Sequence, residues 1–155
     1  MSLHPIIRPS RKNTGFTLIE LMIAVVVLAI IVALALPSFL GSIRKGRRSE
    51  AFAALSAIQQ AQERYRSNNA TYASTLATLG LSSPSGPGGY YALSISSPSA
   101  TGYEVTAAAV AGTSQASDGN CAKLSVQADR GEIKVASCSA CASFTYASTD
   151  PCWSR

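Results

Sequence analysis

The sequence predicts an α+β fold in which one long N-terminal helix packs on a four-stranded antiparallel sheet. Three observations support this prediction: an apolar run from Phe16 to Leu36, an amphipathic segment from Ser49 to Tyr65, and a period of two after Gly89. With 155 residues, the chain is long enough for one modest domain beside a membrane-spanning helix.

The helix has two parts of different character. The run Phe16–Leu36 is long enough to cross a hydrocarbon core of roughly 30 Å. Pro37 lacks an amide hydrogen, so a kink or local melting is expected there. The second part carries residues at spacings of three and four that predict one buried face and an end near Asn68: Ala51, Ala54, Leu55, Ile58, Ala61, Gln62 and Tyr65.

Four short segments after Gly89 alternate apolar with small or polar residues, as half-buried strands do. Their apolar members are Tyr91, Leu93 and Ile95, then Tyr103, Val105 and Ala107, then Leu124 with Val126, and Ile133 with Val135. Asp129-Arg130-Gly131 predicts a tight hairpin between the last two segments. The short linkers make a meander the simplest topology.

Glu20 is the only charge in the apolar run, and Gly15 comes directly before that run. A lone carboxylate in a membrane span costs several kcal/mol unless something neutralises it, which indicates a function. An ordinary secretory signal would place its cleavage site after the apolar stretch, whereas here cleavage at the glycine would leave the helix on the product. A plain membrane anchor has no use for Glu20.

Gly15 followed by Phe16-Thr-Leu-Ile-Glu-Leu-Met-Ile-Ala-Val resembles the N-terminus of type IV pilins and the related pseudopilins. The resemblance implies that a prepilin peptidase cuts after Gly15 and methylates Phe16. It also implies that Glu20 neutralises the amino terminus of a neighbouring subunit during assembly. The chain would then consist of a leader (1–15), a transmembrane and assembly helix (16–43) and a globular pilin domain (44–155).

Further expectations about place and partners follow from the same resemblance. The subunit would cross the inner membrane once, with its globular domain in the periplasm, and later enter an extracellular pilus. Its partners would be other pilin subunits through the N-terminal helix, the prepilin peptidase and the inner-membrane assembly platform. The pilus would serve adhesion, twitching motility or DNA uptake.

The formal net charge of +5 is weak evidence for a nucleic-acid ligand, because its position matters more than its total. Three of the 13 basic residues, Arg8, Arg11 and Lys12, precede the apolar run. The chain from Phe16 onward therefore has ten basic and eight acidic residues, a net charge of +2. Basic residues before a span favour a cytoplasmic leader and an external C-terminal domain.

The four cysteines predict two structural disulfides, since an external domain lies in an oxidising compartment. Cys138 and Cys141 form a CxxC, but a zinc site would need a second close pair and a redox motif a thioredoxin-like context. The pattern Asp118-Gly-Asn-Cys-Ala-Lys-Leu with a final Cys152-Trp resembles a minor-pilin branch that includes the DNA-uptake pilin of naturally competent bacteria. That resemblance implies Cys121–Cys152 and Cys138–Cys141. Counting back from the hairpin instead favours Cys121 with Cys138 and Cys141 with Cys152, so both pairings stay open.

Three functions remain in competition: a structural minor pilin, a DNA receptor of natural competence, and a type II secretion pseudopilin. A DNA surface would combine Lys123, Arg130 and Lys134 with nearby Tyr146 and Trp153. The basic run 44–48 follows the span directly and is expected to be a solvated collar or a subunit contact. The sole histidine, His4, lies in the leader, so we expect no catalytic site, no metal and no cofactor.

Overall fold

The computed structural model describes residues 15–81, 85–86 and 88–153, so the predicted leader lies outside the described residues except for Gly15. The chain divides between Ser38 and Phe39 into two compact units. The first contains the apolar part of helix α1, Leu18–Arg66, and the second contains the rest of that helix and all the strands.

The apolar part of α1 exposes all its large side chains. Every Leu, Ile, Val, Met and Phe from 16 to 36 is exposed, with Phe16 at 83% and Leu34 at 76%. By length and composition this helix could cross a membrane. It runs through Pro37 without interruption, so the helix does not melt there.

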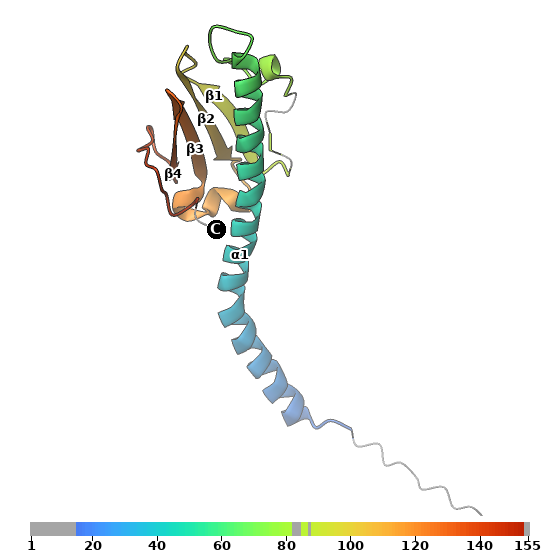
Figure 1. Cartoon of the computed structure of the whole chain (residues 1–155). Coiled ribbons are helices and arrows are strands. Elements are labelled where there is room, and N and C mark those ends of the chain that lie inside the picture. Colours follow the sequence, from blue (N-terminus) through green and yellow to red (C-terminus); the bar gives the residue numbers. More distant parts are fainter. Residues whose placement is uncertain (1–14, 82–84, 87, 154–155) are drawn as a thin grey trace, which may run out of the picture. The chain divides into compact units, whose positions relative to one another are not determined.

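In the second unit, α1 lies along one face of a four-stranded sheet (Figure 1). The strands are β1 (Tyr91–Ser96), β2 (Gly102–Ala109), β3 (Lys123–Asp129) and β4 (Glu132–Cys138). Their order is β1-β2-β3-β4 and each pairs antiparallel with the next, which confirms the predicted α+β meander.

The core lies between the helix and the sheet. The buried residues of α1 are Ala51, Leu55, Ile58, Ala61 and Gln62, whereas Ala54 and Tyr65 of the predicted face are only half-buried. The side chains that face them from the strands include Tyr91, Tyr103, Val105, Leu124 and Val126. The buried amide of Gln62 is fully paired: its Nε2 donates to the Ala73 carbonyl and its Oε1 accepts from the Ala73 amide, both at 2.9 Å.

The hairpin between β3 and β4 lies at the predicted place, and its turn has two residues. Asp129 pairs with Glu132, and Arg130 and Gly131 have φ of 48° and 84°. Positive φ at both central residues gives the turn the twist that two paired strands require, and glycine at the second position adopts it without steric cost.

The connection between β2 and β3 is the longest in the sheet and returns to the helix. It contains two short 3₁₀ helices, η2 (Ser114–Ser117) and η3 (Gly119–Cys121). Gln115 on η2 is completely buried and donates from its Nε2 to the carbonyl of Arg44 at 3.2 Å. The remaining 3₁₀ helix, η1 (Ala77–Leu79), lies between α1 and β1 in the sequence.

Candidate functional site

Among the described residues of the first unit, 15–38, Glu20 carries the only charged side chain. The main-chain amide of Glu20 donates to Thr17 Oγ1 at 3.2 Å at the start of α1. The sequence from 16 to 43 contains no lysine, arginine or histidine, and the next basic residue is Arg44. A cation that neutralises Glu20 within this apolar segment must therefore come from the chain's own amino terminus or from another molecule.

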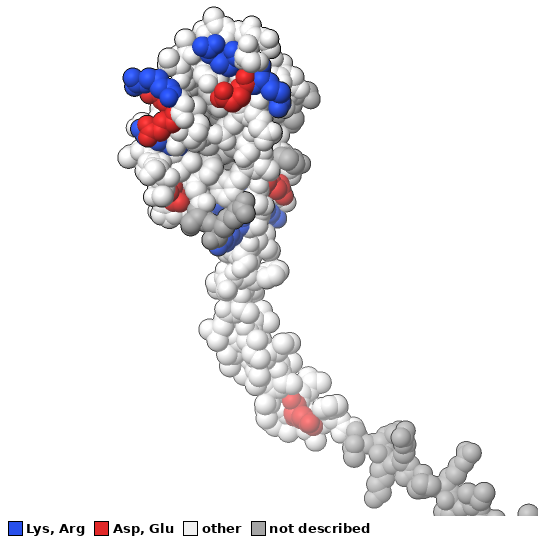
Figure 2. Space-filling model, in the orientation of Figure 1, with Lys and Arg blue, Asp and Glu red and all other residues white. Residues whose placement is uncertain are grey.

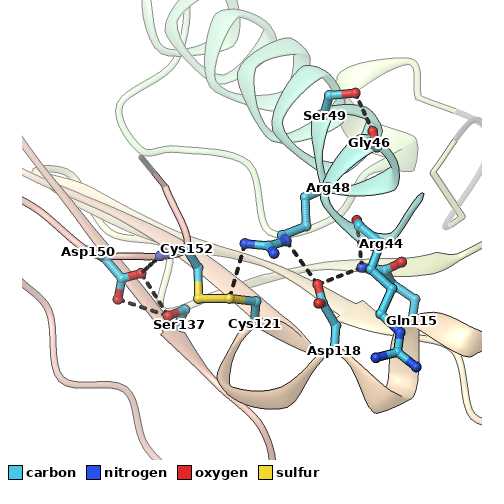
Figure 3. Close-up of polar contacts among 10 residues, drawn as sticks. All are labelled: Arg44, Gly46, Arg48, Ser49, Gln115, Asp118, Cys121, Ser137, Asp150 and Cys152. Carbon is cyan, nitrogen blue, oxygen red and sulfur yellow. Dashed lines mark hydrogen bonds and ion pairs between the residues drawn. A yellow bond between two sulfur atoms is a disulfide. The ribbon is translucent and has the colours of Figure 1, made fainter. Parts of the chain in front are cut away.

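A buried polar cluster joins the first turns of α1 in the second unit to the β2–β3 connection (Figure 3). Arg48 Nε lies 2.9 Å from Asp118 Oδ2, and the two side chains are only 16% and 8% exposed. Gln115 Nε2 donates to the same carboxylate oxygen at 2.8 Å, and Arg48 Nη1 donates to Cys121 Sγ at 3.2 Å. We call Arg48, Gln115, Asp118 and Cys121 the polar clamp.

Burial raises the pKa of Asp118, while Arg48, Arg44 and Gln115 oppose the rise. The same burial raises the pKa of the Tyr91 phenol to about 12. Removing either partner of this buried ion pair would leave the other charge without compensation and would be strongly destabilising, so Arg48 and Asp118 depend on each other. In the basic run 44–48, expected to be a solvated collar or a subunit contact, Arg44, Arg47 and Arg48 are half-buried and Lys45 is exposed.

Two disulfides tie down the C-terminal part of the domain. Cys121 is bonded to Cys152, and Cys138 to Cys141, with Cα–Cα distances of 5.5 and 5.9 Å. Asp150 positions the end of the chain, since its carboxylate accepts from the Cys152 amide at 2.8 Å and from the Ser137 hydroxyl at 2.7 Å (Figure 3). Among the described residues no cysteine is free and no group of three or more metal-binding side chains occurs.

The structure does not bring together the three basic residues that the sequence suggested for DNA. Lys123 and Arg130 lie at opposite ends of β3, about 20 Å apart at the usual rise per residue. Lys134 stands opposite Gln127 and pairs with Glu132 at 3.2 Å. Lys123 Nζ instead donates to the Cys141 carbonyl at 3.4 Å.

The two aromatic residues expected near this surface also lie apart. Tyr146 contacts Ser125, with 2.9 Å between the hydroxyl oxygens, and burial raises the pKa of this tyrosine. Trp153 packs on Phe52 of α1, with ring centroids 4.8 Å apart, and its Nε1 donates to the Ala136 carbonyl. Ser125 faces away from α1 and Phe52 belongs to α1, so the two aromatics occupy opposite faces of the sheet.

Two basic residues contact the β1–β2 turn, Arg66 through its side chain and Arg130 through its main-chain amide. Arg66 Nε at the end of α1 donates to the Ala100 carbonyl at 3.2 Å, and the Arg130 amide donates to the Thr101 carbonyl at 2.8 Å. Arg64 lies in the same last turn of α1 as Arg66. We call Arg64, Arg66, Arg130 and the turn 97–101 the basic tip. Figure 2 shows basic and acidic side chains mixed over the upper end of the domain on the face drawn.

Sequence reasoning did not identify Arg66 as a member of this group. A basic residue at the C-terminal end of a helix is ordinarily explained by its favourable interaction with the helix dipole. Only the contact of the β1–β2 turn with both α1 and the β3–β4 hairpin unites it with Arg130. No signal within the sequence marks that three-way contact.

Comparison with known proteins finds one family model for the N-terminal part of the chain and another for most of the rest. The family model described as "Type IV minor pilin ComP, DNA uptake sequence receptor" matches residues 37–125, and the prokaryotic N-terminal methylation motif matches residues 10–36. The type II secretion system core protein G of Vibrio cholerae is 37% identical over 65 residues, which are 42% of this chain and 44% of that protein.

Two further relatives are a type IV pilin and a second core protein G. The type IV major pilin protein PilA of Myxococcus xanthus is 41% identical over 61 residues, 39% of this chain and 28% of its own length. The core protein G of Escherichia coli strain K12 is 29% identical over 68 residues, 44% of this chain and 47% of that protein. The chain thus spans less than half the length of each of these relatives. Because the minor-pilin model covers more than half of the chain, this protein belongs to the type IV minor pilin family.

Proposed function

We propose that this chain is a minor subunit of a type IV pilus, cut after Gly15, methylated at Phe16 and carried into the filament by its N-terminal helix. The exposure of every large apolar side chain from 16 to 36 carries this proposal. A surface of that kind requires lipid or other apolar helices around it. The match of the methylation motif to residues 10–36 supports the processing step.

Before assembly the subunit crosses the inner membrane once, with the globular domain in the periplasm, and it then enters an extracellular filament. Its partners are the prepilin peptidase, the inner-membrane assembly platform and other pilins. The role is structural and not catalytic. A pseudopilin of type II secretion is the alternative, which the similarity to core protein G favours.

Glu20→Val is expected to leave membrane insertion intact, because the span becomes more apolar, while incorporation into filaments falls strongly. The physical reason is that the mutant cannot neutralise the buried amino terminus of a neighbouring subunit. Quantitative immunoblots of membranes and of sheared filaments measure the two effects separately.

Glu20→Asp is the matched control for this prediction. It keeps the charge on a side chain shorter by one methylene and should retain part of the incorporation. Normal incorporation of the valine variant beside wild type would show that this subunit does not use the charge pair.

A second function is binding of extracellular DNA, which the description of the matching family favours. We propose the basic tip as the contact. Arg130 pairs with Asp129 at 3.2 Å, but both side chains are at least half exposed, so the pair contributes little and a phosphate can replace the carboxylate. Arg66 donates only to carbonyl oxygens in its described hydrogen bonds, which leaves its positive charge uncompensated by them.

Three phosphate contacts from Arg64, Arg66 and Arg130 predict that log K falls with log salt at a slope of about −3. The double variant Arg64→Ala/Arg130→Ala removes two of the charges without touching the contacts of Arg66 to the β1–β2 turn. Its slope should fall to about −1. Titration of a labelled duplex with the domain at several salt concentrations measures both slopes.

Lys123→Ala is the control, since Lys123 lies at the other end of β3 and should leave the slope unchanged. Equal losses from Lys123→Ala and from the double variant would place DNA elsewhere. Tight binding restricted to one duplex sequence would require base contacts beyond these three charges.

A further inference from the structure

We propose that a pocket on α1 binds the headgroup of an anionic phospholipid and holds the globular domain at the membrane surface before assembly. The pocket has a volume of about 440 Å³. It is lined by Lys45, Arg48, Ser49, Phe52, Ala53, Ser56 and Cys152. This inference goes beyond the pilin role, because it concerns lipid and not a subunit or DNA.

The pocket follows one face of the helix. Its α1 residues recur at intervals of three and four, so their side chains lie in a row along the axis. Cations stand at one end, at Lys45 and Arg48, and the aromatic ring of Phe52 lies one turn further on. The pocket therefore offers a cationic rim, two serine hydroxyls and an apolar floor within a single cavity.

The charges around the pocket are not balanced. Arg48 is neutralised by Asp118, and the Arg47 guanidinium lies over the Tyr90 ring at 4.0 Å. Lys45 is exposed and makes no ion pair with any residue that the structure describes. Lys45 is thus the group that can take up an incoming phosphate, with Arg48 held beside it by the polar clamp.

The position in the sequence favours a lipid phosphate over other anions. Lys45 follows Leu36, the end of the apolar run, by only nine residues of the same helix. Anionic headgroups attract a nearby lysine by Coulomb interaction, and tryptophan concentrates at both membrane interfaces. Trp153 packs on Phe52 with ring centroids 4.8 Å apart, which puts an interfacial side chain beside the pocket.

Trp153 is the only tryptophan and so reports on this site alone. The experiment uses the full chain, with one copy in each lipid nanodisc, made either of phosphatidylcholine or of phosphatidylcholine mixed with phosphatidylglycerol. With phosphatidylglycerol, Trp153 emission should shift to shorter wavelength and acrylamide should quench it less. Native mass spectrometry should show phosphatidylglycerol retained on the protein in preference to phosphatidylcholine.

Lys45→Gln should abolish both the spectral shift and the lipid preference. Lys134→Gln makes the same change of charge on β4, at a residue paired with Glu132, and should leave both effects intact. The proposal is overturned if phosphatidylcholine alone gives the same results, or if Lys45→Gln changes nothing. A Trp153 response to inorganic phosphate or to a short DNA duplex would equally overturn it, since the ligand would then not be lipid. Failure of these tests leaves filament incorporation, measured with Glu20→Val, unaffected.

Discussion

Gly15→Arg is expected to leave the leader attached and to exclude the protein from filaments. The proposed cut lies after Gly15, and a small residue is expected to be needed there to fit the peptidase. A Cβ added at Gly15 would meet no described atom within 4 Å, so the described part of the fold has room for a side chain to begin there. N-terminal sequencing of the membrane protein, with immunoblots of sheared filaments, measures processing and assembly together.

Gly15→Ala serves as the control and should be processed, since alanine adds a single methyl group. Wild-type subunits purified from filaments should begin at Phe16. Finding Met1 or Ser2 at their amino terminus would overturn the proposed processing and, with it, the proposed pairing of Glu20 with a neighbour's amino terminus at Phe16.

The two disulfides are expected to contribute unequally to stability. Cys121 and Cys152 are 31 residues apart. By restricting the unfolded chain, a bridge across a loop of this length stabilises the folded domain by about 4 kcal/mol. Cys138 and Cys141 are three apart, for which the same relation predicts about 2 kcal/mol. Replacing both residues of the first bridge by alanine also leaves a smaller side chain at the buried position 152 and removes the sulfur that accepts from Arg48.

Cys121→Ala/Cys152→Ala should therefore lower the free energy of unfolding of the helix-truncated domain about twice as much as Cys138→Ala/Cys141→Ala. Urea denaturation followed by Trp153 fluorescence measures both differences. Mass spectrometry of the wild-type domain after periplasmic expression should find no free thiol. Equal losses from the two double variants would show that loop length does not decide their contributions.

The local architecture of this protein could be predicted from its sequence because its signals are short in range. The apolar run, broken only by Glu20, predicts a helix, and five of the seven residues predicted for the buried face of its second part are buried. Alternation predicts the four strands, and Arg130-Gly131 predicts the turn that joins the last two. Each of these signals depends on neighbours within a few residues.

What remained open were contacts between residues far apart in the sequence. Hairpin counting allowed Cys121 to face Cys138, yet β3 begins only at Lys123, and Lys123 itself stands opposite Cys138. Cys121 belongs instead to η3, where it can reach Cys152 at the end of the chain. The path of the C-terminal segment decided this pairing, and no periodic pattern in the sequence indicates that path.

The charged groups also divide into those whose setting depends on sequence neighbours and those whose setting depends on long-range contacts. The sequence by itself determined that Glu20 stands alone in an apolar helix, since that depends only on which residues adjoin it. Only the tertiary structure decided that Arg48 is paired with buried Asp118, that Lys123 is separated from Arg130, and that Arg66 and Arg130 both contact the β1–β2 turn. The reason is that a charge acts through distance and burial, and both arise only when the helix, the turns and the sheet pack together.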